Sequence, residues 1–502
     1  MMQKNILEYL ENTVNTYPDK IAFSNGKDSL SFADIYSCSR SVGSFLSERG
    51  FYSQPVAIIM DKHPRVMAAF FGVIYSGCFY ACIDEKMPEA RIEAILDKLD
   101  ANIIITDKKN YKLASSFDVE NLFVYEDICQ FECDDAALSA IRNIQSSTDP
   151  IYVAFTSGST GVPKGVVACH RSVIDYTESL CDALEFDEST VFGNQTPLYF
   201  DAPLKEIMPT LKLGATTYFI PKSNFLFPIK LIEYLDEHKI NTICWVVSAL
   251  VQISSLGALE NHVPKHLRTV AFGSELFPRK QYDLWRSALP GATFYNLYGP
   301  TEATGMSCYW KADRDLDENE PIPIGRPFDN TDIILIDENG KRSNSGEICI
   351  RGTCLTMGYY NDPEKTDAVF VQNPLNASYP ELVYRTGDIG EINENGELVF
   401  ICRKDSQIKH MGHRIELGEI ESAANKCDGV RSACCVYDNE AKRIVLFAVA
   451  GVDADASSIA KALQNYLPRY MLPAQIELLP TLPFTTNGKI DRKRLKEIAE
   501  RS

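Results

Sequence analysis

The sequence lacks the features that mark several common classes of protein. Its 502 residues carry a formal net charge of −18, so there is no overall basic surplus. Binding to DNA or RNA requires a basic face that neutralises phosphates, and we therefore expect no nucleic-acid partner. The most apolar stretch, 67–83, contains Gly, Ser and Cys and is shorter than the roughly 20 residues that cross a bilayer. We predict a buried helix that turns into a strand there, and no membrane span.

Paired cysteines are also lacking. The 15 cysteines are scattered, none stands in a CxxC pair, and no spacing typical of a zinc site appears. The first residues, MMQKNILEYLENT, are amphipathic and of mixed charge, unlike a secretory signal. We therefore expect free, mostly buried thiols in a protein of the reducing cytoplasm.

What is present is typical of a folded globular protein with more than one core. The composition is 45% hydrophobic and 24% charged, and the length exceeds that of an ordinary single domain. Short β-rich runs alternate with longer helical patterns, which predicts an α/β architecture with largely parallel sheets. The predicted strands are Val56–Met60, Ile103–Thr106, Ile151–Phe155, Thr242–Val247, Thr269–Phe272 and Thr293–Leu297.

Four of these runs end in polar or glycine-bearing segments: TSGSTG after Phe155, SAL after Val247, GSE after Phe272 and YGPTE after Leu297. In open parallel sheets the ligand crevice lies outside the carboxyl ends of the strands. We therefore expect these four segments to form the walls of one site.

The texture changes towards the C-terminus. From Ile333 the runs are short and separated by turns, which predicts a smaller β-rich unit. Beyond residues 403–405 we expect a helix at 416–427, strands at 433–436 and 443–449, and a helix at 457–466. These features place a domain boundary between residues 403 and 404, with a large domain at 1–403 and a small one at 404–502.

A loop rich in hydroxyls and glycines follows one predicted strand. It reads TSGSTGVPKG from Thr156 to Gly165 and includes Lys164. Glycines let the backbone turn tightly and direct N–H groups at an anion, and the hydroxyls and the lysine add donors. Lys164 is followed by glycine, so this is not a Walker A loop. The alternative is a flexible surface linker, but the strands expected on both sides favour a phosphate-binding loop.

Further motifs occur in order along nearly the whole chain: GCFYACID (77–84), FD (200–201), NLYGPTE (296–302), GE (346–347), YRTGD (384–388), RKDSQIK (403–409), GHRIELGEIE (412–421), LPRYMLP (467–473) and TNGKIDR (486–492). With the loop, they resemble the adenylate-forming (ANL) superfamily, which includes acyl-CoA synthetases, luciferases and adenylation domains of nonribosomal peptide synthetases. The resemblance implies an α/β fold with a large N-terminal domain of mostly parallel sheets plus a β-rich subdomain, and a small mobile C-terminal α+β domain.

The resemblance also implies a nucleotide site for ATP and Mg²⁺. Glu302 is similar to the family's magnesium ligand, and Tyr298 to the ring that stacks on adenine. Asn296 resembles the contact to the exocyclic amine, and Asp388 the carboxylate that accepts both ribose hydroxyls. The full set of implied ATP-binding residues is Thr156, Ser157, Gly158, Ser159, Thr160, Gly161, Lys164, Gly273, Ser274, Asn296, Tyr298, Gly299, Thr301, Asp388 and Arg403. A turn role for Asp388 and a first-turn role for Glu302 are the alternatives for each residue taken alone.

The substrate pocket is implied by the same resemblance. In members that activate amino acids, an aspartate in the place of Asp201 binds the substrate's α-ammonium group. The alternative is that Asp201 caps a helix with Pro203 in its first turn. Lys205 has the spacing of the same helix face and would pair with an acidic substrate side chain, or else with Asp201 or Glu206. The implied pocket residues are Asp201, Ala202, Lys205, Val246, Val270, Phe272, Leu297, Gly305 and Met306. The family's FDxS motif continues here as Asp-Ala-Pro, which is a departure from the pattern.

The last hundred residues carry three further implied roles. Lys489 resembles the catalytic lysine of adenylation, and a solvated lysine in a basic terminal helix is its alternative. Asp405 matches the hinge about which the family's domains rotate, and Lys409 and Gly412 resemble the face that meets an incoming thiol. The implied catalytic residues are Lys489, Glu302 and Lys409.

These observations predict an enzyme that makes an aminoacyl-AMP and releases pyrophosphate. The aminoacyl group then passes to the phosphopantetheine thiol of a separate carrier protein, since no carrier-like serine motif follows residue 492. D-Alanine–carrier protein ligases are one similar group. An acyl- or aryl-CoA ligase and a non-catalytic nucleotide-binding relative are the alternatives; Asp201 argues against the first, and Glu302, Asp388 and Lys489 against the second.

Overall fold

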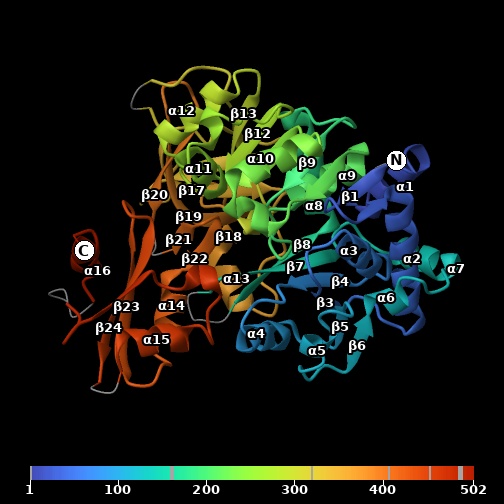
Figure 1. Cartoon of the computed structure of the whole chain (residues 1–502), viewed down its shortest axis with the longest axis horizontal. Helices are drawn as coiled ribbons and strands as arrows, with labels where there is room; N and C mark the ends of the chain where they lie inside the picture. The colour runs from blue at the N-terminus through green and yellow to red at the C-terminus, as the bar shows by residue number, and fades with distance from the viewer. Residues whose placement is uncertain are drawn as a thin grey trace. The chain divides into compact units, whose positions relative to one another are not determined.

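The computed structural model describes residues 3–158, 163–317, 320–404, 407–451, 454–483 and 490–501. The chain forms two compact units, each assembled from several segments, and their helices and strands are labelled in Figure 1. Unit 1 comprises Met1–Glu85, Asp100–Ala154 and Val166–Lys404. Unit 2 comprises Lys86–Leu99, Phe155–Gly165 and Asp405–Ser502. The domain boundary expected between residues 403 and 404 remains a prediction.

A nine-stranded sheet in unit 1 positions most of the predicted site. Its central strands β13, β12, β11, β9, β10 and β1 are parallel, and β2, β14 and β15 pair antiparallel at its edges. The strands are β1 (Ile21–Ser24), β2 (Ser29–Ser31), β9 (Val191–Asn194), β10 (Thr216–Phe219), β11 (Thr242–Val246), β12 (Thr269–Gly273), β13 (Thr293–Tyr298), β14 (Cys308–Lys311) and β15 (Arg326–Pro327).

A second, six-stranded sheet has the order β6-β5-β3-β4-β7-β8. Its strands are β3 (Pro55–Ile59), β4 (Phe79–Ile83), β5 (Ile103–Thr106), β6 (Asn121–Val124), β7 (Pro150–Thr156) and β8 (Lys164–Cys169). β5 is buried along its whole length, which is typical of a parallel strand covered on both faces. The prediction that 67–83 is a helix followed by a strand is confirmed by α3 (Arg65–Tyr75) and β4. None of the helices described is long and apolar enough to cross a bilayer.

Helices connect the strands of these two sheets. Local signals define several of their ends: Ser31 and Asp34 form a capping box at the start of α2, and Gly214 ends α9 in a left-handed conformation. The α-helices of unit 1 are α1 (Leu7–Thr16), α2 (Phe32–Glu48), α3, α5 (Tyr111–Ala114), α6 (Tyr125–Ile128), α7 (Asp135–Ile144), α8 (His170–Leu184), α9 (Leu204–Leu213), α10 (Pro228–Glu237), α11 (Val247–Ser255), α12 (Arg279–Ala288) and α13 (Pro363–Val369).

The β-rich unit expected from Ile333 onward is a five-stranded antiparallel sheet. It contains β16 (Thr331–Ile336), β17 (Ser345–Gly352), β18 (Phe370–Gln372), β19 (Leu382–Ile392) and β20 (Leu398–Arg403). Asp388 on β19 lies directly opposite Arg403 on β20, so the pairing of these strands brings two predicted site residues together.

Unit 2 has its own small core around Ile415, Ile420, Leu446 and Leu463. The predicted helices and strands of this part of the chain are present, with shifted ends. They are α4 (Glu89–Leu99), the hairpin β21 (Gln407–His410) and β22 (His413–Glu416), α14 (Leu417–Ala424), β23 (Val430–Asp438), β24 (Arg443–Ala450), α15 (Ala456–Leu463), β25 (Gln475–Leu478) and α16 (Arg492–Ala499).

One expectation about the sheets is wrong. The four polar strand ends do not come from a single sheet, because β7, which precedes the loop at 156–165, belongs to the six-stranded sheet. The other three strands, β11, β12 and β13, are neighbours in the nine-stranded sheet. Both sheets are buried and parallel, so the apolar runs that encode them look alike in the sequence.

Candidate nucleotide and amino-acid site

The ends of β12 and β13 present the residues expected to contact the base. Asn296 on β13 donates its amide N–H to the carbonyl oxygen of Pro323 at 2.7 Å, which leaves the amide oxygen to accept from an exocyclic amine. Gly273 ends β12, and Ser274 after it has a φ of +70°, which non-glycine residues rarely adopt. Such backbone strain is concentrated at functional sites.

Tyr298, Asp388 and Arg403 form one buried polar group. The hydroxyl of Tyr298 donates to Oδ2 of Asp388 at 2.6 Å, and the guanidinium of Arg403 pairs with Oδ1. Burial and the neighbouring Asp388 carboxylate raise the pKa of Tyr298 well above its ordinary value, so its proton stays on the hydroxyl. Each Asp388 oxygen has a second lone pair with which it can accept from a ligand hydroxyl. The geometry thus leaves the predicted ribose contact possible, and Tyr298 is tied to the same carboxylate.

Glycine is required where Tyr298 continues into the next turn. A Cβ atom on Gly299 would lie 2.5 Å from Cα of Met306 and 2.6 Å from the carbonyl oxygen of Gly305. This close approach brings the predicted nucleotide residues next to two predicted pocket residues.

Glu302 lies in the short turn after β13 and is fully buried. The hydroxyl of Tyr359 donates to its Oε1 at 2.6 Å, and Thr356 donates to its backbone oxygen. No cluster of three or more His, Cys, Asp or Glu side chains that could hold a metal occurs in the described parts of the chain. A single oriented carboxylate nevertheless suits Mg²⁺, which commonly takes one or two protein carboxylates together with substrate phosphates and water.

Asp201 lies beside this group, in the segment that precedes α9. Burial raises the pKa of its carboxyl group, the Glu302 charge also raises it, and the Thr301 hydroxyl and the Lys205 charge lower it. Asp201 is not the helix cap: Pro203 occupies the N-cap position of α9, and no side chain caps this end. The capping alternative is therefore wrong.

A small cavity of about 20 Å³, room for about one water molecule, adjoins Asp201. Tyr80, Tyr152 and Leu204 are among its lining residues. The hydroxyl of Tyr152 is buried and has no hydrogen-bond partner among the described residues. Polar groups thus face one another across this cavity.

The apolar members of the predicted pocket are buried on three adjacent strands and the turn beyond them. Between 0% and 6% of each side chain is exposed for Val246, Val270, Phe272, Leu297 and Met306. Ala202 is partly exposed, and Gly305 has a φ of +87°. Lys205 is buried in α9, but Asp201 lies before that helix, so the two do not share a helix face as expected.

Sequence reasoning misses other residues of this region. A Cβ on Gly305 would lie 3.6 Å from the ring of Tyr176, which comes from α8. Glu206 next to Lys205 is fully buried, and burial raises the pKa of its carboxyl group to about 8. The sequence suggests Glu206 only as a partner for Lys205, and the alternation of apolar and polar residues in α8 gives no sign of Tyr176.

The predicted phosphate loop belongs to unit 2. Ser157 donates its hydroxyl to the carbonyl oxygen of Arg414 at 2.8 Å, and the N–H of Gly158 donates to the carboxylate of Glu419 at 3.1 Å. Lys164 pairs with Glu416 at 3.5 Å. The loop is therefore held, in this arrangement, by groups near the β21–β22 hairpin. Ser159, Thr160 and Gly161 lie outside the described residues, and Thr156 is buried at the end of β7.

Lys409 lies on β21 and Gly412 in the turn of the hairpin. The predicted hinge Asp405 and the predicted catalytic lysine Lys489 lie outside the described residues. Arg91 of α4 stands in none of the sequence motifs; it is buried and pairs with Glu419.

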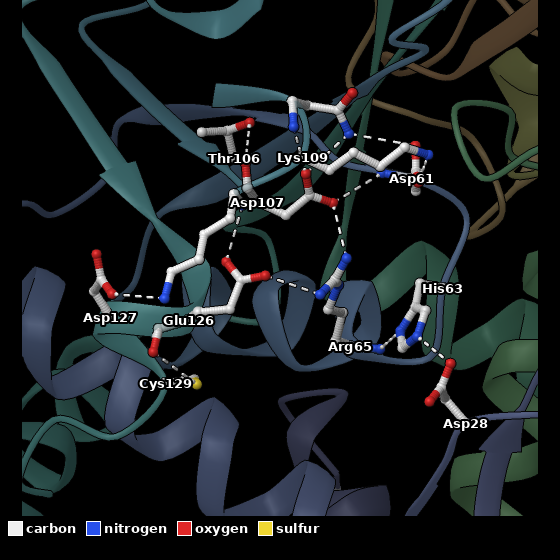
Figure 2. A network of polar contacts seen from close by, with 12 residues as sticks. Asp28, Asp61, His63, Arg65, Thr106, Asp107, Lys109, Glu126, Asp127 and Cys129 are labelled. Carbon is white, nitrogen blue, oxygen red and sulfur yellow. Dashed lines mark hydrogen bonds and ion pairs between the residues drawn. The ribbon is translucent and has the colours of Figure 1, made fainter. Parts of the chain in front are cut away.

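A polar network that no motif indicates closes the ends of β3 and β5 (Figure 2). Arg65 contacts Asp107 at 3.1 Å and Glu126 at 2.8 Å, and Asn110 donates to the other Asp107 oxygen at 2.9 Å. Lys109 pairs with Asp61 after β3. These groups satisfy one another and fix the loops of the six-stranded sheet.

Comparison with known proteins defines the class to which this fold and site belong. The model of the AMP-binding enzyme family matches residues 10–360, and that of the AMP-binding enzyme C-terminal domain matches residues 419–489. Since the first match alone covers more than half of the chain, the protein belongs to the AMP-binding enzyme family. The predicted superfamily and its fold are thereby confirmed.

Among similar sequences is one of the linear gramicidin synthase proteins of Brevibacillus parabrevis, which is 32% identical over 97% of this chain. The chain spans only 6% of that protein's length. Zwittermicin A synthase ZmaJ of Bacillus cereus is 29% identical over 98% of this chain and 94% of its own length.

Solved structures show the same fold. The Vibrio cholerae adenylation domain AlmE, in complex with glycyl-adenosine-5'-phosphate, superposes with a TM-score of 0.86 at 21% identity, covering 100% of this chain and 99% of AlmE.

Proposed function

We propose that this protein activates an amino acid with ATP, forming aminoacyl-AMP and pyrophosphate, and passes the aminoacyl group to the phosphopantetheine thiol of a separate carrier protein. The observation that carries the proposal is the proximity of Asp201 and Glu302, whose charges influence one another inside unit 1. A carboxylate suited to an ammonium group thus lies beside one suited to the magnesium of a nucleotide.

In the first step, a carboxylate oxygen of the amino acid attacks the α-phosphorus of ATP, and the bond from that phosphorus to the bridging oxygen of pyrophosphate breaks. Asp201 would hold the ammonium group and so place the carboxylate. Asn296 and Asp388 would fix the base and the ribose, which converts the attack into a reaction between positioned groups. A Mg²⁺ held by Glu302 and the phosphates would supply positive charge against the charge that develops on the transferred group. The resemblance assigns a similar charge-stabilising role to Lys489.

In the second step, the thiolate of phosphopantetheine attacks the carbonyl carbon of the adenylate, and AMP leaves. Lys409 and Gly412 on the β21–β22 hairpin are the residues proposed to meet the thiol. The hairpin structure supports this proposal because its tight register holds both residues at one end of a two-stranded element.

The relatives support this activity over the alternatives. The similar sequences include a linear gramicidin synthase and a zwittermicin A synthase, and AlmE was solved with an aminoacyl adenylate, a compound of the class proposed here. The carrier partner is supported by PA1221, a similar structure described as containing adenylation and carrier (PCP) domains.

The test is exchange of labelled pyrophosphate into ATP with purified protein. A screen would include L-amino acids, D-alanine, D-glutamate, and aryl and fatty acids. Exchange that depends on an amino acid is expected. Exchange with aryl or fatty acids alone would replace the proposal with an acyl- or aryl-CoA ligase, and no exchange with any acid would refute catalysis.

A further inference from the structure

The buried ammonium group of Lys205 lacks a partner within the described structure. Only 3% of Lys205 is exposed, yet its Nζ makes no hydrogen bond and no ion pair with any described residue. Its neighbour Lys62 is different, because its Nζ donates to the carbonyl oxygens of Asn194, Gln195 and Thr196 at 3.0–3.3 Å. The two lysines therefore have opposite needs: Lys62 is saturated and Lys205 is not.

The position of the Lys205 charge follows from the groups that respond to it. It lowers the pKa of Asp201 before α9, of Glu206 in α9 and of Cys244 on β11. The ammonium group therefore lies between α9 and β11, next to the pocket that Asp201 opens. Its nitrogen is not among the fully enclosed polar atoms that lack a partner, so it borders an open space.

Neither nearby carboxylate neutralises this charge. Asp201 is assigned to the ammonium group of the substrate. Glu206 forms its hydrogen bond with Asn194 at 3.3 Å, and burial raises its pKa to about 8, so it is mostly protonated at neutral pH. A buried ammonium group without a counter-ion is strongly unfavourable, and such groups are found paired or bound to ligands.

We propose that Lys205 binds a carboxylate on the side chain of the substrate, so that the amino acid activated is an acidic one of the aspartate or glutamate type. The inference rests on the proposed function, since it names the substrate class of the same site. It adds a positive specificity group to a pocket whose other predicted members, such as Val246 and Phe272, are apolar. The substrate would then be held at two ends, by Asp201 at its ammonium group and by Lys205 at its side-chain carboxylate.

The experiment compares acids with their amides in pyrophosphate exchange. The pairs are L-glutamate and L-glutamine, L-aspartate and L-asparagine, and D-glutamate and D-glutamine. For one pair, kcat/KM of the acid is expected to exceed that of the amide by about a hundredfold. In Lys205→Met, which keeps the length of the side chain without its charge, that preference is expected to disappear while the amide retains its exchange.

Lys62→Met is the matched control, because it removes the other lysine of this region, whose ammonium group is already saturated. It is expected to keep the preference for the acid. If the wild-type protein exchanges only with neutral amino acids and Lys205→Met keeps the same ranking, the inference is wrong and the proposed function stands. The wild-type comparison alone decides this if Lys205→Met does not fold.

A binding measurement separates failure of the inference from failure of the function. The probes are glutamyl- and glutaminyl-sulfamoyl adenosine, and aspartyl- and asparaginyl-sulfamoyl adenosine, non-reactive mimics of the adenylates. Calorimetry with the wild-type protein is expected to show about a hundredfold tighter binding of one acidic mimic than of its amide. Equal affinities within both pairs would overturn the assignment of Lys205 even if no exchange were observed with any acid.

Discussion

The hydroxyl of Tyr298 and the carboxylate of Asp388 are joined by a hydrogen bond of 2.6 Å, although 90 residues separate them in the chain. One residue ends a central strand of the nine-stranded sheet, and the other lies in the antiparallel sheet that follows it. This bond fixes the β-rich sheet against the strand ends that are proposed to bind the nucleotide. Asp388 is thereby oriented for the ribose before any ligand arrives.

Replacing Tyr298 with Phe removes only that hydroxyl. Because a hydrogen bond to a charged group contributes about 1.5–3 kcal/mol, we expect the free energy of unfolding to fall by that amount, with a higher KM for ATP. Urea denaturation and pyrophosphate-exchange kinetics measure the two effects. Tyr309→Phe on β14 removes a hydroxyl that accepts from the exposed Arg326, and it is expected to change both quantities much less. Equal effects of the two substitutions would contradict an orienting role for Tyr298.

Glu419 is expected to stabilise unit 2 strongly. Its carboxylate is buried, accepts from Gly158 and pairs with the buried Arg91. Breaking a buried ion pair commonly costs about 3–5 kcal/mol, so Glu419→Gln should lower the free energy of unfolding by about that amount. The measurement is urea denaturation followed by a probe of unit 2. Glu440→Gln, at an exposed position of the same unit, should change stability by no more than about 0.5 kcal/mol. A small effect of Glu419→Gln would show that this ion pair forms only transiently.

His170 makes stability depend on pH. It is fully buried, its Nδ1 accepts from the N–H of Ile6 at 3.2 Å, and burial, together with the Arg142 charge, lowers its pKa to about 3. In the unfolded chain the ring takes up a proton below about pH 6.5. The neutral ring therefore contributes stability that is fully present above pH 6.5 and is lost as the pH falls towards 3.

This loss amounts to about 1.4 kcal/mol per pH unit within that window, or about 2 kcal/mol between pH 6.5 and pH 5. Urea denaturation at pH 7 and pH 5 measures it. His170→Gln should weaken the decline in stability between these two pH values, whereas His262→Gln, at an exposed position, should preserve it. The same decline in wild type and His170→Gln would mean that His170 is protonated in the folded protein.

Asp201→Ala tests the ammonium site. Since it removes a desolvated carboxylate opposite a cation, activation of amino acids should fall by about 3–5 kcal/mol of transition-state stabilisation, roughly two hundredfold or more in kcat/KM. Carboxylic acids that lack the amino group should be affected little. Pyrophosphate exchange with each amino acid and its des-amino analogue gives the ratio. An equal loss for both would show that Asp201 acts on the structure of the pocket and not on the ammonium group.

The sequence predicts the core strands well because each is a short, nearly continuous apolar run. The run at 103–106 is β5, and the helix expected at 228–238 is α10 with its end one residue earlier. Val270 and Phe272 are buried as expected of pocket walls, since alternate side chains of one strand share a face.

Other features depend on contacts between distant segments and leave no local signal. Arg91 and Glu419 are 328 residues apart, and neither stands in a pattern that announces its partner. Spacing alone predicts Asp201 on a helix face with Lys205, but Pro203 takes the N-cap position and excludes Asp201 from the helix. The saturation of Lys62 and the isolation of Lys205 both result from three-dimensional packing, which residue type does not reveal.

The three-segment construction of unit 2 has a consequence for recombining such enzymes. Glu416 and Glu419 from the C-terminal part contact Lys164, Gly158 and Arg91 from two earlier segments. A chimera made by exchanging everything after residue 404 would separate these partners, whereas one that also transfers 86–99 and 155–165 would keep them together. Crossover points chosen by contacts should therefore yield more functional hybrids than a single cut at the apparent hinge.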